Sequence, residues 1–130
     1  MARRKSQTLT DGELRIMDVI WEREESTVRA VTDALNASEP VAYNTVQTML
    51  GILADKGYVT HRKDGRAFVY SALVDRASAR RSAVKHMVSR FFGGSSEALV
   101  QNLLQDDAMD ALEIDRLRAL LREDASADEQ

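Results

Sequence analysis

A helical pattern that leads directly into a strand pattern occupies residues 43–71, YNTVQTMLGILADKGYVTHRKDGRAFVYS. Its first half predicts a helix from about Ala42 to Lys56, because apolar residues recur at i, i+3, i+4 and i+7 and Gly57 suits the left-handed position past the end. The residues with that spacing are Val46, Met49, Leu50 and Leu53. The second half predicts a β-hairpin, since aromatic and β-branched residues flank the turn-forming pair Asp64-Gly65.

Two shorter helices are predicted upstream of this stretch. The segment Thr10–Glu13 has the pattern of a capping box, so a helix is expected to begin there and to run to about Glu22. Ser26 or Thr27 is expected to cap a second helix, which the helix breakers in residues 36–40 end. Three short helices followed by a hairpin are typical of a winged helix-turn-helix, in which the third helix enters a DNA major groove and the hairpin forms the wing.

Further amphipathic helices are predicted downstream, one from Asp75 to the glycine-serine run at 93–96, one over 97–105 and one over about 110–123. The predicted fold class is therefore mainly α with a small β-hairpin wing. The predicted domains are a winged-helix DNA-binding domain (1–73), a helical dimerisation domain (74–123) and a disordered tail (124–130). Because a lone chain has little else to cover the apolar stripes, we expect a homodimer. The expected interface residues are Val84, Met87, Val88, Phe91, Leu99, Leu103, Ile114, Leu117 and Leu121.

The formal net charge of -3 hides an uneven distribution of charge along the chain. Residues 1–92 hold 15 basic and 11 acidic residues, whereas residues 93–130 hold 3 basic and 10 acidic residues. A basic N-terminal part can face a polyanion, so this asymmetry favours nucleic-acid binding by the first two thirds of the chain. No apolar run approaches the roughly 18 residues that cross a bilayer, so a cytoplasmic protein without membrane insertion is expected.

Side chains for catalysis or metal binding do not form a known pattern. The chain has no Cys, which excludes thiolate nucleophiles and Cys-ligated metals. His61 and His86 lie 25 residues apart without metal-ligand spacing, and neither a Gly-x-Ser-x-Gly motif nor a glycine-rich phosphate loop occurs. We therefore expect no enzyme activity and no bound cofactor or metal ion.

The third predicted helix carries short hydrogen-bonding side chains on the face that its apolar residues leave free. Asn and Gln can read adenine edges, Thr can meet a thymine methyl group or a phosphate, and a Tyr hydroxyl can fix the register on the DNA backbone. Cations on the hairpin and in the N-terminal arm can contact phosphates. The predicted DNA-binding residues are Tyr43, Asn44, Thr45, Gln47 and Thr48 on the helix, Arg62, Lys63 and Arg66 on the wing, and Arg3, Arg4 and Lys5 in the arm.

Short motifs spread over residues 8–122 resemble those of one family of regulators. They are LTDGEL at 9–14, Trp21, YNTVQTML at 43–50, KGYV at 56–59 and GRAFVY at 65–70. On these motifs the chain resembles the penicillinase repressor (BlaI/MecI) family. The resemblance implies a winged-helix domain joined to a helical dimerisation domain, bound as a homodimer to a dyad-symmetric operator. It also implies that the polar face of the third helix, together with Lys63 and Arg66, contacts DNA.

The same resemblance implies a switch. In that family, a membrane-bound sensor protease that responds to a β-lactam causes the repressor to be cut in its dimerisation domain, usually at an Asn-Phe bond. The matching bond here is Asn102–Leu103, so Leu stands where the family usually has Phe. Control of antibiotic resistance genes, with a sensor protease encoded nearby as a partner, is implied in the same way. The copper-responsive branch of the family uses a Cys cluster, which this chain lacks.

Two alternatives remain open from the sequence alone. A winged-helix protein-interaction module would bind protein with the same helix and wing, but the basic residues on the wing favour DNA. A DNA-binding regulator released by a small-molecule effector would need a pocket, and the sequence indicates no polar one. The pair Gly51-Ile52 stands where family members often carry basic residues, so phosphate anchoring along the third helix is expected to be weaker or to be supplied elsewhere.

Overall fold

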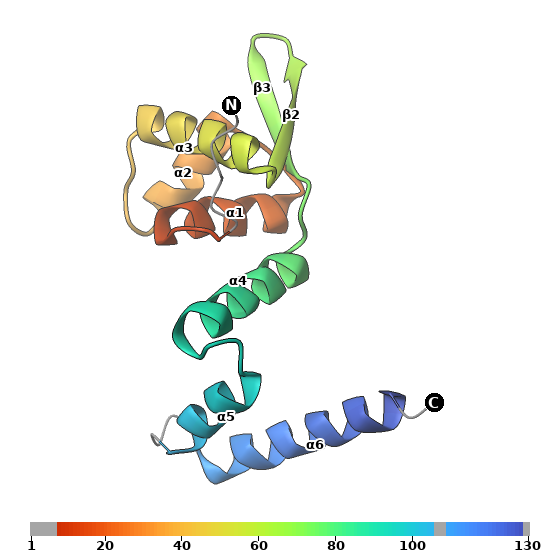
Figure 1. Ribbon diagram of the computed structural model, residues 1–130. Coiled ribbons are helices and arrows are strands. Elements are labelled where there is room, and N and C mark those ends of the chain that lie inside the picture. Colours follow the sequence, from red (N-terminus) through yellow and green to blue (C-terminus); the bar gives the residue numbers. More distant parts are fainter. Residues whose placement is uncertain (1–7, 106–108, 129–130) are drawn as a thin grey trace. The chain divides into compact units, whose positions relative to one another are not determined.

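The computed structural model describes residues 8–105 and 109–128 and forms them into six helices and three strands (Figure 1). The chain divides into two compact units after His86, a point that lies within α4. None of the described helices combines the length and the hydrophobicity needed to span a membrane. The elements in chain order are α1 (Asp11–Arg23), β1 (Glu25–Thr27), α2 (Val28–Asn36), α3 (Tyr43–Lys56), β2 (Val59–Asp64), β3 (Ala67–Ala72), α4 (Arg76–Phe91), α5 (Ser96–Gln105) and α6 (Ala111–Asp128).

Local hydrogen bonds fix the helix ends of the first unit where the sequence predicts them. The hydroxyl of Thr10 accepts from the Glu13 amide at 3.2 Å, and the Glu13 carboxylate accepts from the Thr10 amide at 2.9 Å, which confirms the capping box of α1. Thr27 caps α2 by accepting from the Ala30 amide at 3.0 Å. Gly57 ends α3 with a left-handed φ of 86°, as its position predicts.

The hairpin belongs to a three-stranded antiparallel sheet with the order β1-β3-β2. β2 and β3 pair from Val59 opposite Ala72 to Asp64 opposite Ala67, so the predicted hairpin is confirmed, and it projects beyond the helices of this unit (Figure 1). β1 pairs with the other edge of β3. The sequence does not predict β1, because three residues are too few to show the alternation of a strand.

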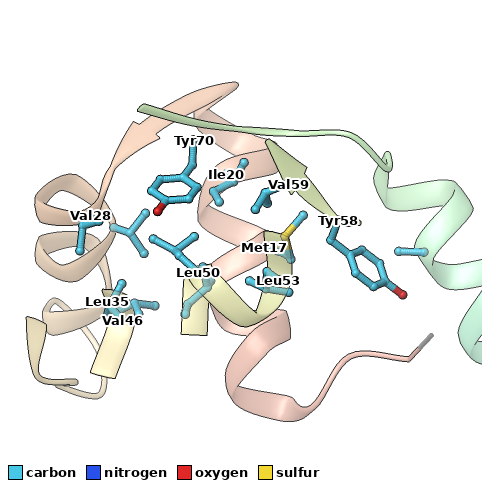
Figure 2. Packing of buried hydrophobic residues seen from close by; sticks show 13 residues of the cluster. Met17, Ile20, Val28, Leu35, Val46, Leu50, Leu53, Tyr58, Val59 and Tyr70 are labelled. Atoms are coloured by element: carbon cyan, nitrogen blue, oxygen red, sulfur yellow. The ribbon is translucent and has the colours of Figure 1, made fainter. Parts of the chain in front are cut away.

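The core of the first unit lies between α1, α2, α3 and one face of the sheet (Figure 2). Tyr58, Val59 and Tyr70 enter it from the hairpin side. Since the buried residues of α3 all lie on one side of that helix, its opposite side must face outward. Each large apolar side chain buried here stabilises the fold by about 1.5–3 kcal/mol. The side chains with the least exposure are Ile16, Met17, Ile20, Val31, Val46, Leu50 and Leu53.

The first turns of α4 pack on α1. Ala79 is buried within the core cluster of the first unit. The indole nitrogen of Trp21 donates to the carbonyl of Val74 at 2.9 Å, just before α4 begins, and Arg76 forms an ion pair with Asp18 at 3.4 Å. The start of α4 is therefore held by contacts to the winged helix.

The second unit has far less buried apolar surface. No side chain of α5 is buried, and α6 exposes Leu112, Leu120 and Leu121. Asp110 and Glu113 exchange hydrogen bonds of 2.8 and 3.1 Å at the start of α6 in a second capping-box arrangement. The helix then continues to Asp128, five residues past its predicted end at Glu123 and into the segment predicted to be disordered. The two alanines in this extension have the highest helix propensity of any residue type.

Candidate nucleic-acid interface

The outward side of α3 carries the side chains expected to contact DNA. All five polar residues predicted on this helix are exposed: Tyr43, Asn44, Thr45, Gln47 and Thr48. Asn44, Thr48 and Gly51 recur at i, i+4 and i+7, so they form the centre of the outward side, with Gln47 and Thr45 on either flank. A Cβ atom added at Gly51 would meet no atom within 4 Å, so the helix surface is bare at that point. The result is a ridge of short donors and acceptors that a groove can receive.

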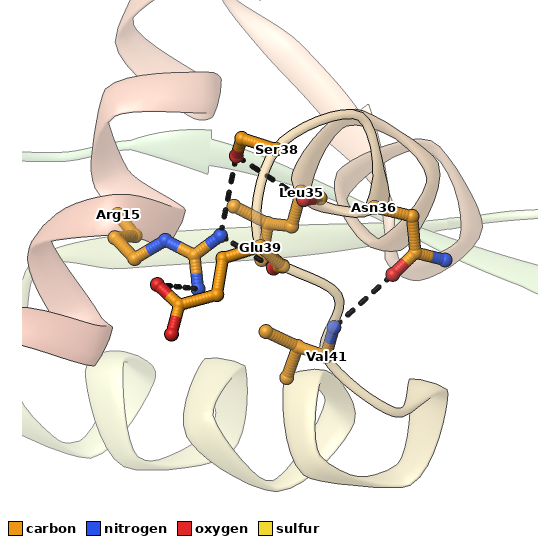
Figure 3. A network of polar contacts seen from close by, with 6 residues as sticks. All are labelled: Arg15, Leu35, Asn36, Ser38, Glu39 and Val41. Carbon is orange, nitrogen blue, oxygen red and sulfur yellow. Dashed lines mark hydrogen bonds and ion pairs between the residues drawn. The ribbon is translucent and has the colours of Figure 1, made fainter.

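The turn that leads into α3 is tied down from α1 (Figure 3). The guanidinium of Arg15 donates to the carbonyl of Glu39 at 2.7 Å and to the Ser38 hydroxyl at 3.5 Å, and it lies 4.0 Å from the Glu39 carboxylate. Within the turn, the Asn36 side chain accepts from the Val41 amide at 3.1 Å. Arg15 is therefore occupied in positioning the start of α3, a role that sequence reasoning missed because its partners lie more than 20 positions away.

A buried ion pair holds the other end of α3. The ammonium group of Lys56 lies 2.7 Å from the Glu13 carboxylate, and the side chains are only 12% and 5% exposed. The same ammonium donates to the carbonyl of Thr8 at 3.2 Å. Burial opposes the ionisation of Glu13, but hydrogen bonds from Lys56 and Thr10 outweigh it, so the pKa of Glu13 lies below its usual value. The carboxylate therefore serves both the α1 cap and the end of α3.

The start of α3 is also linked to α2 through Tyr43. The guanidinium of Arg29 lies 5.1 Å from the centre of the Tyr43 ring, a cation-π contact. Burial, with a smaller contribution from Tyr43, raises the pKa of Tyr70 on β3. Arg29 is exposed on the first turn of α2 and adds a cation beside the recognition surface that the sequence does not predict. Only the packing of α2 against α3 brings it there.

The wing separates its predicted cations onto different faces. Lys63 lies opposite Phe68 and Arg62 opposite Val69, and neighbouring residues of a strand point to opposite sides. Arg62 is paired with Glu25 of β1, with its Nη2 3.0 Å and its Nε 3.2 Å from one carboxylate oxygen. Within the part of the chain that the structure describes, the side chains of Lys63 and Arg66 make no hydrogen bond or ion pair and both residues are exposed, so both remain available to an anion.

Aromatic residues line the Lys63 side of the wing. The His61 ring lies 4.8 Å from the Phe68 ring in an edge-on arrangement and 5.3 Å from the Tyr70 ring. Phe68 is 44% exposed although it sits on the strand face that is buried further along. The contacts stiffen the wing, and they account for an exposed aromatic residue whose role the sequence does not predict.

The remaining predicted residues lie apart from this surface. Arg3, Arg4 and Lys5 fall outside the described residues. Asn102 is exposed on α5 and Leu103 is half-buried beside it. Among the residues predicted for a dimer interface, Val84, Phe91 and Leu121 are exposed, and Val88 is already buried within the single chain. The half-buried members of that set are Met87, Leu99, Leu103, Ile114 and Leu117. No group of three potential metal ligands occurs in the described part of the chain.

Comparison with known proteins identifies close counterparts of this architecture. The profile of the penicillinase repressor family matches residues 9–123. The penicillinase repressor of Bacillus licheniformis is 32% identical over 92% of this chain and 94% of its own length. The methicillin resistance regulatory protein MecI of Staphylococcus aureus (strain N315) is 22% identical over 90% and 95%. The transcriptional regulator BlaI of Mycobacterium tuberculosis (strain CDC 1551 / Oshkosh) is 33% identical over 80% and 88%.

Solved structures agree on the fold. The solution structure of the DNA-binding domain of the repressor BlaI matches 58% of this chain and 93% of that domain, with 34% identity and a TM-score of 0.52. The complex structure of hsRosR-S4 covers 92% of this chain and 91% of that one, with 21% identity and a TM-score of 0.53, and it shares the fold alone. The predicted fold class, mainly α with a hairpin wing, is therefore confirmed.

Proposed function

The chain belongs to the penicillinase repressor family, and we propose that it acts as a homodimeric transcriptional repressor on a dyad-symmetric DNA operator. The family consists of repressors rather than enzymes, so the chain is not an enzyme. The observation that carries the proposal is the outward side of α3, where Asn44, Gln47 and Thr48 are exposed together. The contacts of Arg15 with Glu39 before the helix and of Lys56 with Glu13 at its end support a rigid placement of this surface.

In this proposal α3 lies in the major groove and the wing lies along the backbone. Asn44 and Gln47 offer amides that pair with an adenine edge, and Thr48 offers a methyl group and a hydroxyl. Lys63 and Arg66 at the tip of the wing contact phosphates, which position the protein without reading sequence. Arg62 stays a candidate phosphate contact, because its ion pair with Glu25 joins two side chains that are 58% and 51% exposed and is therefore weak.

We further propose that the apolar residues exposed on α4, α5 and α6 pair with those of a second copy. Phe91 is 73% exposed and Leu120 is 61% exposed, far more than a stable monomer needs to leave in water. Two copies related by a twofold axis bind two half-sites, which places the α3 helices about 34 Å apart or a multiple of that distance. The operator then mirrors the symmetry of the protein.

Release by proteolysis at Asn102–Leu103 completes the proposal, with a membrane sensor protease as the partner and β-lactam resistance genes as the regulated set. Asn102 is exposed, which supports access to this side of α5. A cut there would detach residues 103–130 and with them the whole of α6. Loss of the dimer would remove the high effective concentration at the second half-site, which is worth on the order of 10²–10⁴ in affinity.

The test selects binding sites from a pool of random duplex DNA with the full chain. We expect one enriched sequence with twofold symmetry, bound by two protomers at nanomolar to sub-micromolar concentration. A chain ending at Asn102 should bind the same half-site but lose most of the affinity for the full site. Enrichment of no sequence would contradict operator binding, and equal affinity of the shortened chain would contradict release by this cut.

A further inference from the structure

A pocket between α1 and the first turns of α4 lies outside the surface assigned to DNA. Its volume is about 320 Å³, which lies in the range of small-molecule sites, roughly 300–1,000 Å³. Leu14 and Trp21 of α1 form one apolar wall, and Ala83 of α4 contributes to the other. Leu14 is 43% exposed, so a large apolar side chain faces solvent at this opening.

The pocket also carries a surplus of positive charge. Arg76 forms an ion pair with Asp18 at 3.4 Å, and its guanidinium lies 5.2 Å from the centre of the Trp21 ring. Arg80, one turn further along α4, also lines the pocket. Within the described residues the side chain of Arg80 makes neither an ion pair nor a hydrogen bond, and the residue is exposed. One cation at the rim of an apolar pocket is therefore left without a counter-charge.

Trp21 also lines a second hollow, whose charged residues have the opposite sign. That hollow, of about 510 Å³, is lined by the carboxylates of Glu24 and Asp75 and by no basic residue. The indole nitrogen of Trp21 donates to the Val74 carbonyl at 2.9 Å, which fixes the orientation of the ring. The charges therefore favour an anion in the pocket that Arg76 and Arg80 line and disfavour one in the hollow that Glu24 and Asp75 line.

We propose that the pocket between α1 and α4 binds a small amphipathic monoanion, a ring-bearing carboxylate of about a dozen non-hydrogen atoms. Its ring lies against Leu14 and Trp21, and its carboxylate meets the free guanidinium of Arg80. A ligand of this size in an open pocket binds with a dissociation constant on the order of 10 µM to 1 mM. The binding itself is independent of the repressor function. An effector role for the ligand rests on the proposed function, since α4 leads from the winged helix into the residues expected to dimerise.

The experiment uses Trp21 as the reporter, because it is the only Trp in the chain. The full chain without DNA is titrated with 4-phenylbutyrate, 4-phenylbutanol and 4-phenylbutylamine, which share a skeleton and differ in charge. We expect a saturable change in Trp21 fluorescence, with the acid bound at least threefold more tightly than the alcohol and the amine bound most weakly. Shifts of the Ala79 and Ala83 amide resonances measure the same binding independently of the fluorescence.

Three variants localise the site. Arg80→Gln should remove the preference for the acid, whereas Lys85→Gln, an equal loss of charge on an exposed residue of the same helix, should keep it. Ala83→Leu should fill the pocket and weaken the acid and the alcohol together. The proposal is overturned by the absence of any saturable response up to about 10 mM, since a site of the proposed affinity would be largely occupied at that concentration. Equal affinity for the three ligands, or an unchanged preference in Arg80→Gln, overturns it as well.

The effector role is judged separately. Operator titrations with and without saturating 4-phenylbutyrate should differ in midpoint by at least threefold, and by linkage the operator should change the affinity for the ligand by the same factor. An unchanged midpoint with intact ligand binding would contradict the effector role alone. Failure of the chain to bind any operator without ligand would contradict the proposed function and leave the fluorescence result to decide the pocket.

Discussion

Replacing Lys56 by Met would remove the cation from the buried ion pair that holds the end of α3. The Glu13 carboxylate is 5% exposed, and among the described residues Thr10 would remain as its hydrogen-bonding partner, with the backbone amide at 2.9 Å. Breaking a buried pair from one side costs about 3–5 kcal/mol, because a charge remains buried without compensation. A domain of this kind unfolds at a cost of about 5–15 kcal/mol, so the variant should lose a large share of its stability.

The assay is urea unfolding followed by circular dichroism, with Glu13→Gln and the double variant completing a double-mutant cycle. At a slope of about 1–2 kcal/mol/M, Lys56→Met should lower the midpoint by roughly 2 M or more. In Glu13→Gln/Lys56→Met the buried charge is gone, and the oxygen of the new side-chain amide can still accept from the Thr10 backbone amide. The double variant should therefore be more stable than Lys56→Met alone. Free energies that add within about 0.5 kcal/mol would refute the reasoning.

The contribution of Glu13 to the free energy of unfolding should decrease as the pH falls. Burial alone would raise the pKa of Glu13, but the hydrogen bonds from Lys56 and Thr10 lower it below its usual value in the folded state. The unfolded chain therefore takes up a proton first as the pH falls. The stabilisation by Glu13 is fully present above the unfolded pKa, about 4.3 for Glu, and is lost as the pH falls through the lower folded pKa. The stability gap between the wild type and Glu13→Gln should accordingly narrow below about pH 4.

Three further predictions concern recognition and assembly. Gln47→Ala should cost roughly 1–3 kcal/mol of binding free energy on the selected operator and relax the base preference at one position per half-site, as measured by fluorescence anisotropy. Lys63→Ala should weaken binding to the operator and to random DNA alike, and should reduce the slope of log affinity against log salt concentration by about 0.9. Equal losses on both DNAs for Gln47→Ala would mean that Gln47 does not read a base. Leu117→Asp should shift the chain toward monomer in sedimentation velocity, because it buries a charge without a partner in the proposed dimer interface. A wild type that is already monomeric at micromolar concentration would contradict the dimer. Gly51→Lys should tighten binding to all DNA sequences and make the dependence of log affinity on log salt concentration steeper by about 0.9, because the new side chain meets open space and can reach a phosphate. An unchanged salt dependence would show that α3 does not approach phosphates at this position.

Most of the first unit could be predicted from its sequence because short-range rules determine it. The capping box at Thr10, the cap at Thr27 and the left-handed Gly57 each act over three or four residues, and the structure confirms all three. The apolar spacing also located the outward side of α3 correctly, since burial of one side of a helix leaves the other exposed. β1 escaped prediction because it is three residues long and is defined by its pairing with β3.

The side chains that hold the recognition surface could not be predicted, and the reason is common to them. Arg15 reaches Glu39 over 24 positions, Arg62 reaches Glu25 over 37, and Lys56 reaches Glu13 over 43. A basic residue is equally suited by its sequence to a phosphate or to a distant carboxylate, so the sequence predicts Arg62 as a DNA contact but not its ion pair with Glu25. The partner of a cation follows from the tertiary fold, and periodicity carries no information about it.

Residues that hold α3 in place and residues that read the operator should respond differently to mutation. Loss of the Arg15 or Lys56 contact would disturb the placement of α3 and weaken operator binding, although neither residue is assigned to DNA. Such a variant loses stability and specific binding together, while its affinity for random DNA depends on Lys63 and Arg66 and should change little. A true base-reading residue such as Gln47 loses specific binding at constant stability. Measuring unfolding and both DNA affinities on each variant therefore separates the residues that read the operator from those that hold the reading helix.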